Sequence, residues 1–397
     1  MTGPELAPGQ RARKLLSRVP LIDGHNDLPY ALRDAGAMDL ASVDLAAPVS
    51  FTHTDLPRIA AGRLGAQFWS VYVPASLAGE AAVTTTLEQI DLVHRMVRRY
   101  PDRLELAVTA DDVQRIFAAG RVASLIGAEG GHSIASSMGV LRTMYALGVR
   151  YLTLTHNRNV PWADSATDEP RADGLTAFGR AVVGEMQRLG MLVDLSHVSA
   201  DTMRDALDVA AAPVIFSHSS ARALCDHPRN VPDDVLARLP GNGGLCMVTF
   251  VPDFVSPECA AWAAQLTADM RERGLDPWDF DVREQAIQDR AAAHPQPTAT
   301  LAQVADHVEH VRQVAGVGHA GLGGDFDGTF QLPDGLTDVS CYPALFAELL
   351  SRGWTEDDCA RLAGGNLLRV LRGAEDAARA LAAERAPSTV RIEDLDG

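Results

Sequence analysis

Residues 20–29 read PLIDGHNDLP, and this stretch decides how the rest of the chain is interpreted. A short apolar segment leads directly into a histidine and acidic residues, among them His25 and Asp27. Burying a lone carboxylate costs on the order of several kcal/mol. A strand that ends in such groups therefore predicts a bound cation or another counter-charge at that end.

Seven further apolar runs follow along the chain, and most of them also end in polar residues. Their near-continuous apolarity favours parallel strands covered on both faces over strands with one solvated face. Segments with helical spacing of apolar residues separate them, most clearly at 84–100, 177–190 and 300–317. The seven runs are AQFWSVYVP (66–74), VASLIGAEG (122–130), RYLTLTH (150–156), MLVDLSH (191–197), PVIFSH (213–218), GGLCMVTFV (243–251) and AGLGGDFDG (320–328).

Strand followed by helix, repeated about eight times, predicts an α/β fold of the (β/α)8 TIM-barrel type. An open, doubly wound parallel sheet is the alternative. We expect residues 1–397 to form a single barrel domain, with a C-terminal helical tail near 355–385. The stretch 253–298 interrupts the rhythm and predicts an insertion after the seventh strand. Long connections of this kind often serve as lids or subunit contacts.

The charge balance narrows the class of partner. Thirty-five basic and 52 acidic residues give a formal net charge of −17. Nucleic acids and anionic membranes are bound by basic faces, so the composition argues against both as partners. Tightly bound divalent cations would offset part of this negative charge.

The ends of the chain and its cysteines bear on the compartment. The first twenty residues contain no apolar core of a secretory signal, no run of 18 apolar residues is present, and the last residues are polar. We therefore expect a cytoplasmic protein without a membrane partner, and we expect a homodimer. The five cysteines form no CxxC pair and are interpreted as buried thiols, with a Cys225–Cys259 disulfide as the alternative.

The barrel prediction gathers polar residues from distant parts of the sequence. In a barrel of this type, the carboxyl ends of the strands surround one mouth, where active sites lie. Residues i and i+2 of a strand point the same way, so His25 and Asp27 can face one site while Asn26 turns aside. The histidines and acids expected at this mouth are His25, Asp27, Glu129, His156, His197, His218 and Asp325.

Five of these residues have the chemistry of a metal centre. Three imidazoles and two carboxylates suit zinc or a neighbouring first-row metal, and one ion rarely needs five protein ligands. We therefore predict two such ions that share a bridging carboxylate. Glu129, on a strand between the two ligand sets, is predicted to bridge them. Two such ions lower the pKa of a shared water.

Two loops add candidate functional residues. In GGDFDG (323–328), the glycines are expected to let the backbone pass close to a ligand. Asp325 or Asp327 would then project beside the site, and Asp325 is interpreted as a proton carrier. In CDHPRNVPDD (225–234), an arginine can clamp a carboxylate in bidentate fashion. The remaining eight histidines are interpreted as ordinary polar residues, and His307 and His310 as part of a solvated helix face.

Taken together, the motifs resemble the renal (membrane) dipeptidase family, metallopeptidases of the amidohydrolase-like barrel group. The resemblance runs from about residue 20 to 372. It is carried by DGHNDLP (23–29), GAEGGHSI (127–134), RYLTLTHNRNVPWADS (150–165), LVDLSHVS (192–199), VIFSHSSARALCDHPRNVPDD (214–234), GLGGDFDG (321–328) and LAGGNLLRVL (362–371).

The resemblance implies a role for each residue of the site. His25 and Asp27 would bind the first zinc, His197 and His218 the second, and Glu129 both. The same resemblance implies three roles toward substrate: His156 polarises the scissile carbonyl, Arg229 grips the terminal carboxylate, and Asp325 delivers a proton to the leaving amine.

The implied activity is hydrolysis of dipeptides with free amino and carboxyl termini, including those with a D-residue at the carboxyl end. Two alternatives remain from the residues alone. One is another barrel hydrolase acting on N-acyl amino acids, cyclic amides or lactones, which would not need Arg229 as a carboxylate clamp. The other is a non-catalytic, metal-bound member of the family.

Overall fold

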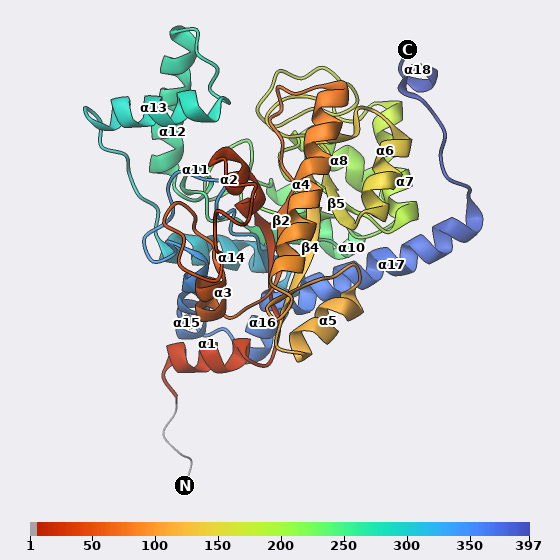
Figure 1. The fold of residues 1–397 in the computed structure, drawn as a ribbon. Coiled ribbons are helices and arrows are strands. Elements are labelled where there is room, and N and C mark those ends of the chain that lie inside the picture. The colour runs from red at the N-terminus through yellow and green to blue at the C-terminus, as the bar shows by residue number, and fades with distance from the viewer. Residues whose placement is uncertain (1–5) are drawn as a thin grey trace.

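Parallel strand pairing closes the sheet of this protein on itself. The computed structural model describes residues 6–397. Within them, β1 pairs with β2 and with β9, and β2 also pairs with β4, so that eight strands form a closed ring (Figure 1). The barrel prediction is confirmed, and the open-sheet alternative is wrong. The eight strands are β1 (Leu21–Asn26), β2 (Leu64–Ser70), β4 (Val122–Glu129), β5 (Val149–Thr153), β6 (Leu192–Asp194), β7 (Ile215–Phe216), β8 (Leu245–Val248) and β9 (Ala320–Leu322).

Each of the eight predicted apolar runs contains or overlaps one of these strands. One further strand, β3 (Leu104–Leu106), was not predicted. It pairs with the first residues of β4, outside the closed ring. A strand of three residues carries too few side chains to produce a recognisable period.

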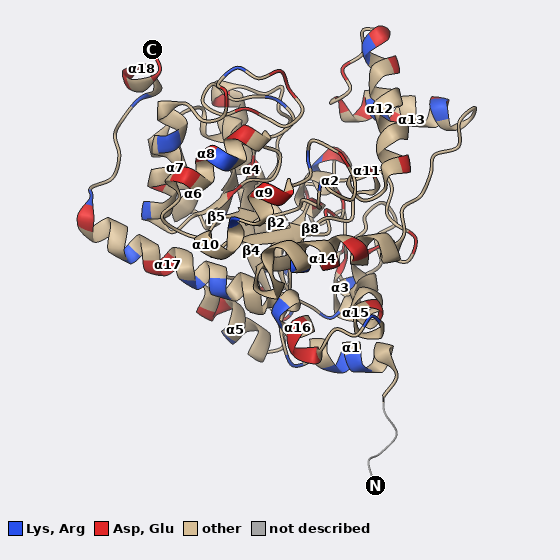
Figure 2. Cartoon of the chain, turned by 180° about the vertical axis from the view of Figure 1, so that it is seen from behind, with Lys and Arg blue, Asp and Glu red and all other residues tan. Residues whose placement is uncertain are grey.

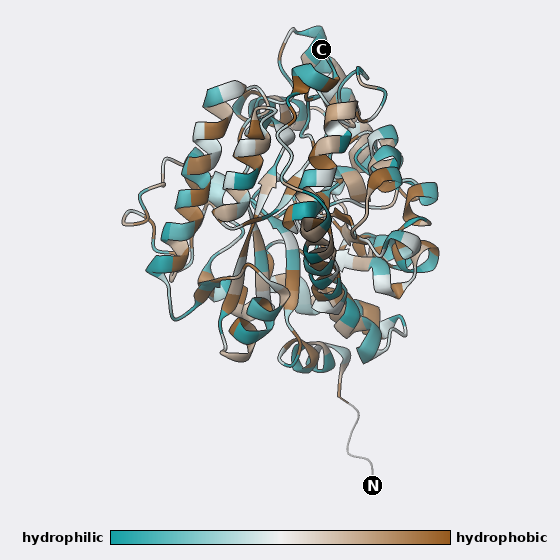
Figure 3. Cartoon of the chain, turned by 90° about the vertical axis from the view of Figure 1, so that its right-hand side faces the viewer, coloured by the Kyte–Doolittle hydropathy of each residue, from teal (hydrophilic) through white to brown (hydrophobic). Residues whose placement is uncertain are grey.

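Helices cover the outside of the barrel, and the three predicted ones correspond to α4, α7 and α14. Side-chain caps fix several helix starts: Thr109 accepts from the N–H of Asp112, and Thr300 forms a capping box with Gln303. Figure 3 shows hydrophilic and hydrophobic residues alternating along these helices, as expected for elements with one face on the core. The α-helices are α1 (Pro8–Leu16), α2 (Leu28–Asp34), α3 (Leu56–Gly62), α4 (Gly79–Arg99), α5 (Ala110–Ala118), α6 (Met138–Ala146), α7 (Ala177–Leu189), α8 (Ala200–Val209), α9 (Asp233–Leu236), α10 (Leu239–Asn242), α11 (Pro252–Val255), α12 (Pro257–Glu272), α13 (Phe280–Ala291), α14 (Leu301–Ala315), α15 (Tyr342–Ser351), α16 (Glu356–Ala360), α17 (Asn366–Glu384) and α18 (Ile392–Leu395).

The core has two main parts. Large strand residues such as Phe68 and Leu125 form one buried cluster with residues of α5 and α17, which lie at the lower end of the barrel in Figure 1. A larger cluster fills the space between the strands and the surrounding helices. With the lower end filled by side chains, the opposite end of the barrel is left to hold a site.

The segment predicted as an insertion forms α11, α12 and α13, which project at the upper left in Figure 1. Trp262, Leu266 and Met270 of α12 make a separate apolar cluster with Ala286 of α13. The helical hairpin thus has its own small core. The predicted tail coincides with α16 and α17, which a short π-helix at Arg361–Gly365 connects.

Acidic and basic residues share the surface, and the cysteines are unpaired. Figure 2 shows acidic and basic residues interspersed over the outer helices seen from behind. Within residues 6–397, no helix combines the length and apolarity that crossing a membrane requires. All five cysteines are free thiols; four are buried and Cys341 is partly exposed.

One histidine interpretation was wrong. His307 is not part of a solvated face but is fully buried, where its Nδ1 accepts a hydrogen bond from the N–H of Ala221 at 3.1 Å. Its Nε2 lies 3.0 Å from the carbonyl oxygen of Val255. His307 therefore joins α14 to the loop after β7 and to α11, an arrangement that a periodicity argument on one helix does not reveal.

Candidate active site

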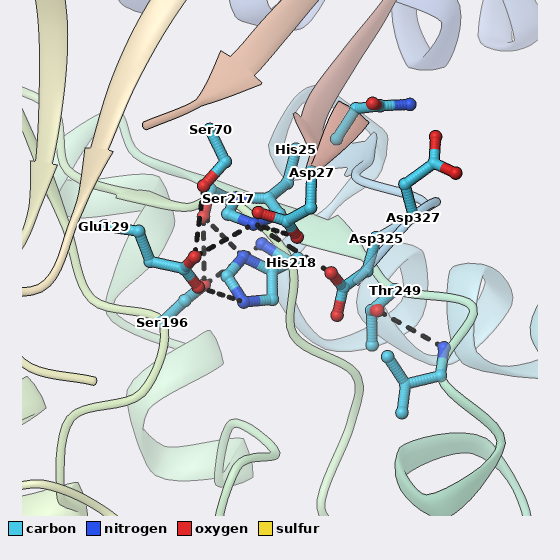
Figure 4. A network of polar contacts seen from close by, with 12 residues as sticks. His25, Asp27, Ser70, Glu129, Ser196, Ser217, His218, Thr249, Asp325 and Asp327 are labelled. Atoms are coloured by element: carbon cyan, nitrogen blue, oxygen red, sulfur yellow. Dashed lines mark hydrogen bonds and ion pairs between the residues drawn. The ribbon is translucent and has the colours of Figure 1, made fainter. Parts of the chain in front are cut away.

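The structure brings all eight predicted site residues to one end of the barrel (Figure 4 shows His25, Asp27, Glu129, His218 and Asp325). Each follows or ends a strand: His25 lies in β1, Glu129 ends β4, and the others lie in the loops that leave the strands. As predicted, the Asn26 side chain turns aside and donates to Thr54. A cavity of about 870 Å³ opens above them and is lined by Asp27, Glu129, His156, His197, Arg229 and Asp325.

Glu129 lies between the two predicted ligand sets. Its Oε2 is 3.4 Å from Nε2 of His25 and accepts a hydrogen bond from Ser70 at 3.1 Å. Its Oε1 is 2.9 Å from Nε2 of His197 and 3.4 Å from Nε2 of His218. Each oxygen of one carboxylate therefore faces a different set of imidazoles, which is the geometry that a bridging ligand requires.

A chain of hydrogen bonds fixes the proton on His218. The Ser217 hydroxyl donates to Asp194 at 2.6 Å, so its oxygen is left to accept from His218 Nδ1, 2.8 Å away. Asp194 is held in turn by the hydroxyl of Thr153 and by the N–H groups of Ser196 and Ser217. With its proton on Nδ1, His218 presents the lone pair of Nε2 to the site, as a metal ligand must.

Tyr151 supports His25 in a similar way. Its hydroxyl oxygen lies 2.8 Å from Nδ1 of His25, and both side chains are fully buried. Gly127 makes room for this tyrosine, because a Cβ at that position would stand 2.0 Å from the Tyr151 ring. Neither Tyr151 nor Asp194 was predicted as a site residue. Both lie inside apolar strands, where the sequence gives no sign that a polar atom points at a ligand.

Three observations show that the donor set fits divalent cations. Nε2 of His197 and Nε2 of His218 lie 3.0 Å apart, so that one cation could contact both. Oδ1 of Asp27 is buried without a hydrogen-bond partner among the described residues. Burial lowers the pKa values of His197 and His218 well below the usual range, so both imidazoles are neutral. Neutral imidazole with carboxylate is the donor set of zinc and its neighbours.

The site carries more negative than positive charge. Burial by itself lowers the pKa of His25, yet Tyr151, Glu129 and Asp27 raise it well above the usual value. Burial also raises the pKa of the Asp325 carboxyl well above its usual range, and Asp27 and Glu129 add to that rise. In the bare protein a proton on His25 balances part of this charge. A bound cation would take over that role.

Arg229 is a buried cation with no acidic partner close by. Arg229 is 2% exposed, and within residues 6–397 no carboxylate lies within 4.0 Å of its guanidinium. It donates long hydrogen bonds of 3.4 Å to the Ser219 hydroxyl and to the carbonyl of His218, and its Nε has no partner. Burial lowers its pKa to about 10. A guanidinium left this unsatisfied at a cavity wall is suited to an incoming carboxylate.

His156 and Asp325 complete the wall of the cavity. Nε2 of His156 is 3.8 Å from Oε1 of Glu129, and burial holds its pKa well below the usual range, so it is a neutral hydrogen-bond donor. Asp325 has a positive φ of 59°, and its Oδ1 lies 3.9 Å from Nε2 of His25. A backbone angle that L-residues rarely adopt turns this carboxylate toward His25 and the other predicted metal ligands.

Gly323 and Gly324 of GGDFDG allow a close approach to neighbouring parts of the protein. A Cβ at Gly323 would stand 1.8 Å from the carbonyl oxygen of Ser217, and one at Gly324 would stand 2.8 Å from the Phe326 ring. This close approach lets the loop after β9 pack against the loop that carries His218.

Comparison with known proteins gives one consistent result. A family model described as membrane dipeptidase (peptidase family M19) matches residues 9–385. Dipeptidase verJ of Clonostachys rogersoniana is 42% identical over 377 residues, which cover 92% of this chain and 87% of that protein. Mouse Dipeptidase 3 is 43% identical over 373 residues, which cover 92% of this chain and 66% of that protein.

A solved structure shares the fold. The metallopeptidase from Rhodobacter sphaeroides, liganded with a phosphinate mimic of the dipeptide L-Ala-D-Ala, superposes with a TM-score of 0.73. It is 23% identical, and the match covers 90% of this chain and 99% of that one.

Proposed function

Since this chain belongs to the membrane dipeptidase family of metallopeptidases, we propose that it is a binuclear zinc dipeptidase acting on dipeptides with free amino and carboxyl termini. One observation carries the proposal: the two oxygens of Glu129 face two separate sets of imidazoles beneath a cavity whose wall holds the unpaired Arg229.

The contacts of Glu129 support the following ligand assignment. His25 and Asp27 would hold one zinc, His197 and His218 the other, and Glu129 both. Bound there, the cations would supply a water of lowered pKa and polarise the scissile carbonyl. Ser217 and Tyr151 would keep two of the imidazoles in the orientation that binding needs.

The chain's own residues would bind and orient the substrate. Arg229 would pair with the terminal carboxylate of the substrate. Its guanidinium has no acidic partner among the described side chains, and the substrate would supply one. His156, neutral and at the cavity wall, would donate a hydrogen bond to the carbonyl oxygen as negative charge develops there. A carboxylate clamp beside the reacting centre would leave room for one residue between the scissile bond and the carboxyl end. Capture of the free amino group as well would restrict the site to dipeptides.

Asp325 would carry the proton. It stands beside the first ligand pair and at the cavity surface, so it can accept a proton from the attacking water and deliver it to the departing amine. We extend the substrate class to dipeptides with a D-residue at the carboxyl end. The Rhodobacter sphaeroides metallopeptidase, which shares the fold, supports this extension, since its ligand mimics L-Ala-D-Ala.

A screen of L-X-L-X and L-X-D-X dipeptides with metal quantification tests the proposal. We expect two zinc ions per chain and much faster hydrolysis of dipeptides with a free carboxylate than of amidated ones. Protein that holds two ions but hydrolyses N-acyl amino acids or lactones instead of dipeptides would contradict it. The homodimer, the cytoplasmic location and the single-domain organisation stay predictions, which size-exclusion chromatography, cell fractionation and limited proteolysis would test.

A further inference from the structure

The helical hairpin formed by α12 and α13 makes the outer wall of the active-site cavity. Residues from both helices and from the turn between them line the same 870 Å³ space as Glu129 and Arg229. This volume lies toward the upper end of the range for small-molecule sites, about 300–1,000 Å³. A dipeptide of two small residues would leave much of that space to water.

The two faces of α12 have different tasks. Trp262, Leu266 and Met270 pack against α13 in the hairpin's own core. Ala261, Ala264 and Ala268 share another face, line the cavity and are exposed. Exposed helix faces usually carry charged or polar side chains. Here three methyl groups give an apolar stretch of wall, and Arg271 follows them on the same face at the end of the helix.

Aromatic side chains extend this wall. Trp278 and Phe280 line the cavity at the end of the hairpin, and the ring of Phe280 packs against Phe330 with centroids 4.1 Å apart. Phe254, in α11 just before the hairpin, lines it from below. These apolar side chains contact water when no ligand covers them. Binding of an apolar group there is favourable because it removes apolar surface from water.

The hairpin is held in place from two sides. Arg158, in the loop after β5, forms an ion pair with Asp276 in the turn between α12 and α13. Arg283 of α13 lies 3.8 Å from Asp253 of α11 and donates to the Thr267 hydroxyl. The wall is therefore fixed relative to the catalytic residues, as a specificity pocket requires.

We propose that this hairpin selects dipeptides whose carboxyl-terminal residue has a large apolar side chain. The inference rests on the proposed function and assigns its substrate class. The Arg229 guanidinium lies 5.0 Å from the centroid of the Phe254 ring, and α11 runs directly into α12. The residue whose carboxylate pairs with Arg229 is therefore the one beside Phe254 and the alanine face, and its side chain fills the space under the hairpin.

The test fills that space from the protein side. Ala264→Phe places a ring on the cavity face of α12, and Ala380→Phe makes the same change on an exposed face of α17 as a control. The substrates are Ala-Phe, with L- or D-phenylalanine, and Ala-Gly, which share both termini. We expect the unaltered enzyme to favour Ala-Phe in kcat/KM by roughly tenfold or more, since filling an apolar pocket discriminates by about 10–200-fold.

Ala264→Phe should remove most of this preference, because the new ring should lower kcat/KM for Ala-Phe much more than for Ala-Gly. Ala380→Phe should change neither. Trp278→Ala, which only removes wall surface, should also lower kcat/KM for Ala-Phe selectively. Equal losses for both substrates, or no change in their ratio in either variant, would overturn the inference.

The two levels of proposal fail differently. If metal-loaded protein hydrolyses Ala-Gly but the hairpin variants leave the substrate ratio unchanged, the selectivity inference alone is wrong. If it hydrolyses neither dipeptide, the proposed function is wrong and the inference falls with it. Circular dichroism and zinc content of each variant show that the fold and the metal centre are retained.

Discussion

Oε1 of Glu129 lies 2.9 Å from Nε2 of His197, while the other oxygen of the same carboxylate faces His25 at 3.4 Å. The three residues come from β4, from the loop after β6 and from β1. A single side chain thus connects two halves of the site. Replacing one of its oxygens should weaken the link between the two proposed metal positions.

Glu129→Gln should lower the zinc content from two ions per chain to one or none, because an amide offers one neutral acceptor where the carboxylate offers two charged oxygens. Inductively coupled plasma mass spectrometry after gel filtration measures this directly. Glu88→Gln, a surface change in α4, is the control. Two ions retained in Glu129→Gln would show that another residue bridges them.

The hydrogen-bond chain from Asp194 through Ser217 should contribute to metal affinity. Ser217→Ala removes the acceptor that keeps the proton of His218 on Nδ1, and we expect zinc affinity to fall by about 10–100-fold. Competition with a chelator measures the change without reference to turnover. Ser220→Ala, another buried serine on the same loop, should leave the affinity unchanged. Equal behaviour of the two variants would assign Ser217 a purely structural role.

Arg229→Ala should raise KM for dipeptides with a free carboxylate. A buried charge-assisted pair contributes on the order of 2–3 kcal/mol, which corresponds to roughly 30–150-fold. Amidated dipeptides have no carboxylate to lose, so their slower hydrolysis should change much less. If both substrate types weaken equally, Arg229 supports the fold of the loop and does not bind the substrate.

Asp325→Asn should keep both zinc ions and lose turnover. An amide cannot carry a proton from water to the leaving amine, and general acid–base groups contribute about 10²–10⁴-fold to rates. Parallel measurement of zinc content and kcat separates this effect from loss of metal. Turnover close to that of the unaltered enzyme, with zinc bound, would exclude Asp325 from the chemistry.

His227 should make the stability of the protein depend on pH through the loop that carries Arg229. Its Nδ1 accepts the N–H of Arg229 at 3.2 Å, and burial, with help from nearby arginines, lowers its pKa to about 3. The unfolded chain, with an ordinary histidine pKa near 6.5, binds more protons between these values. The free energy of unfolding therefore falls as the pH drops below about 6.5.

His227→Asn, whose side-chain oxygen can accept the same N–H, should remove this contribution. Between pH 7.5 and 5 the unaltered protein should lose up to about 2 kcal/mol more than the variant, and less if water reaches the half-buried ring. Urea unfolding at both pH values measures the difference. Parallel losses in the two proteins would show that His227 does not titrate on unfolding.

The sequence determined the barrel and the chemistry available at its mouth. Eight apolar runs separated by helical segments leave few folds other than a parallel barrel, and the two-residue spacing places His25 and Asp27 together at the end of the first strand. Residue type then predicts a metal centre, since only ions or counter-charges make such burial tolerable. These conclusions depend on local patterns. Each pattern spans only a few neighbouring residues and can therefore be recognised in the sequence.

The tertiary structure decided everything that depends on distances between strands. Closure of the ring sets which oxygen of Glu129 faces which imidazole, and it brings Asp194 and Ser217 behind His218 and Tyr151 behind His25. It also folds the 253–298 segment into a wall over the cavity. Such relationships arise from strand register and from loops that meet only once the barrel has closed, so no periodicity in the sequence can carry them.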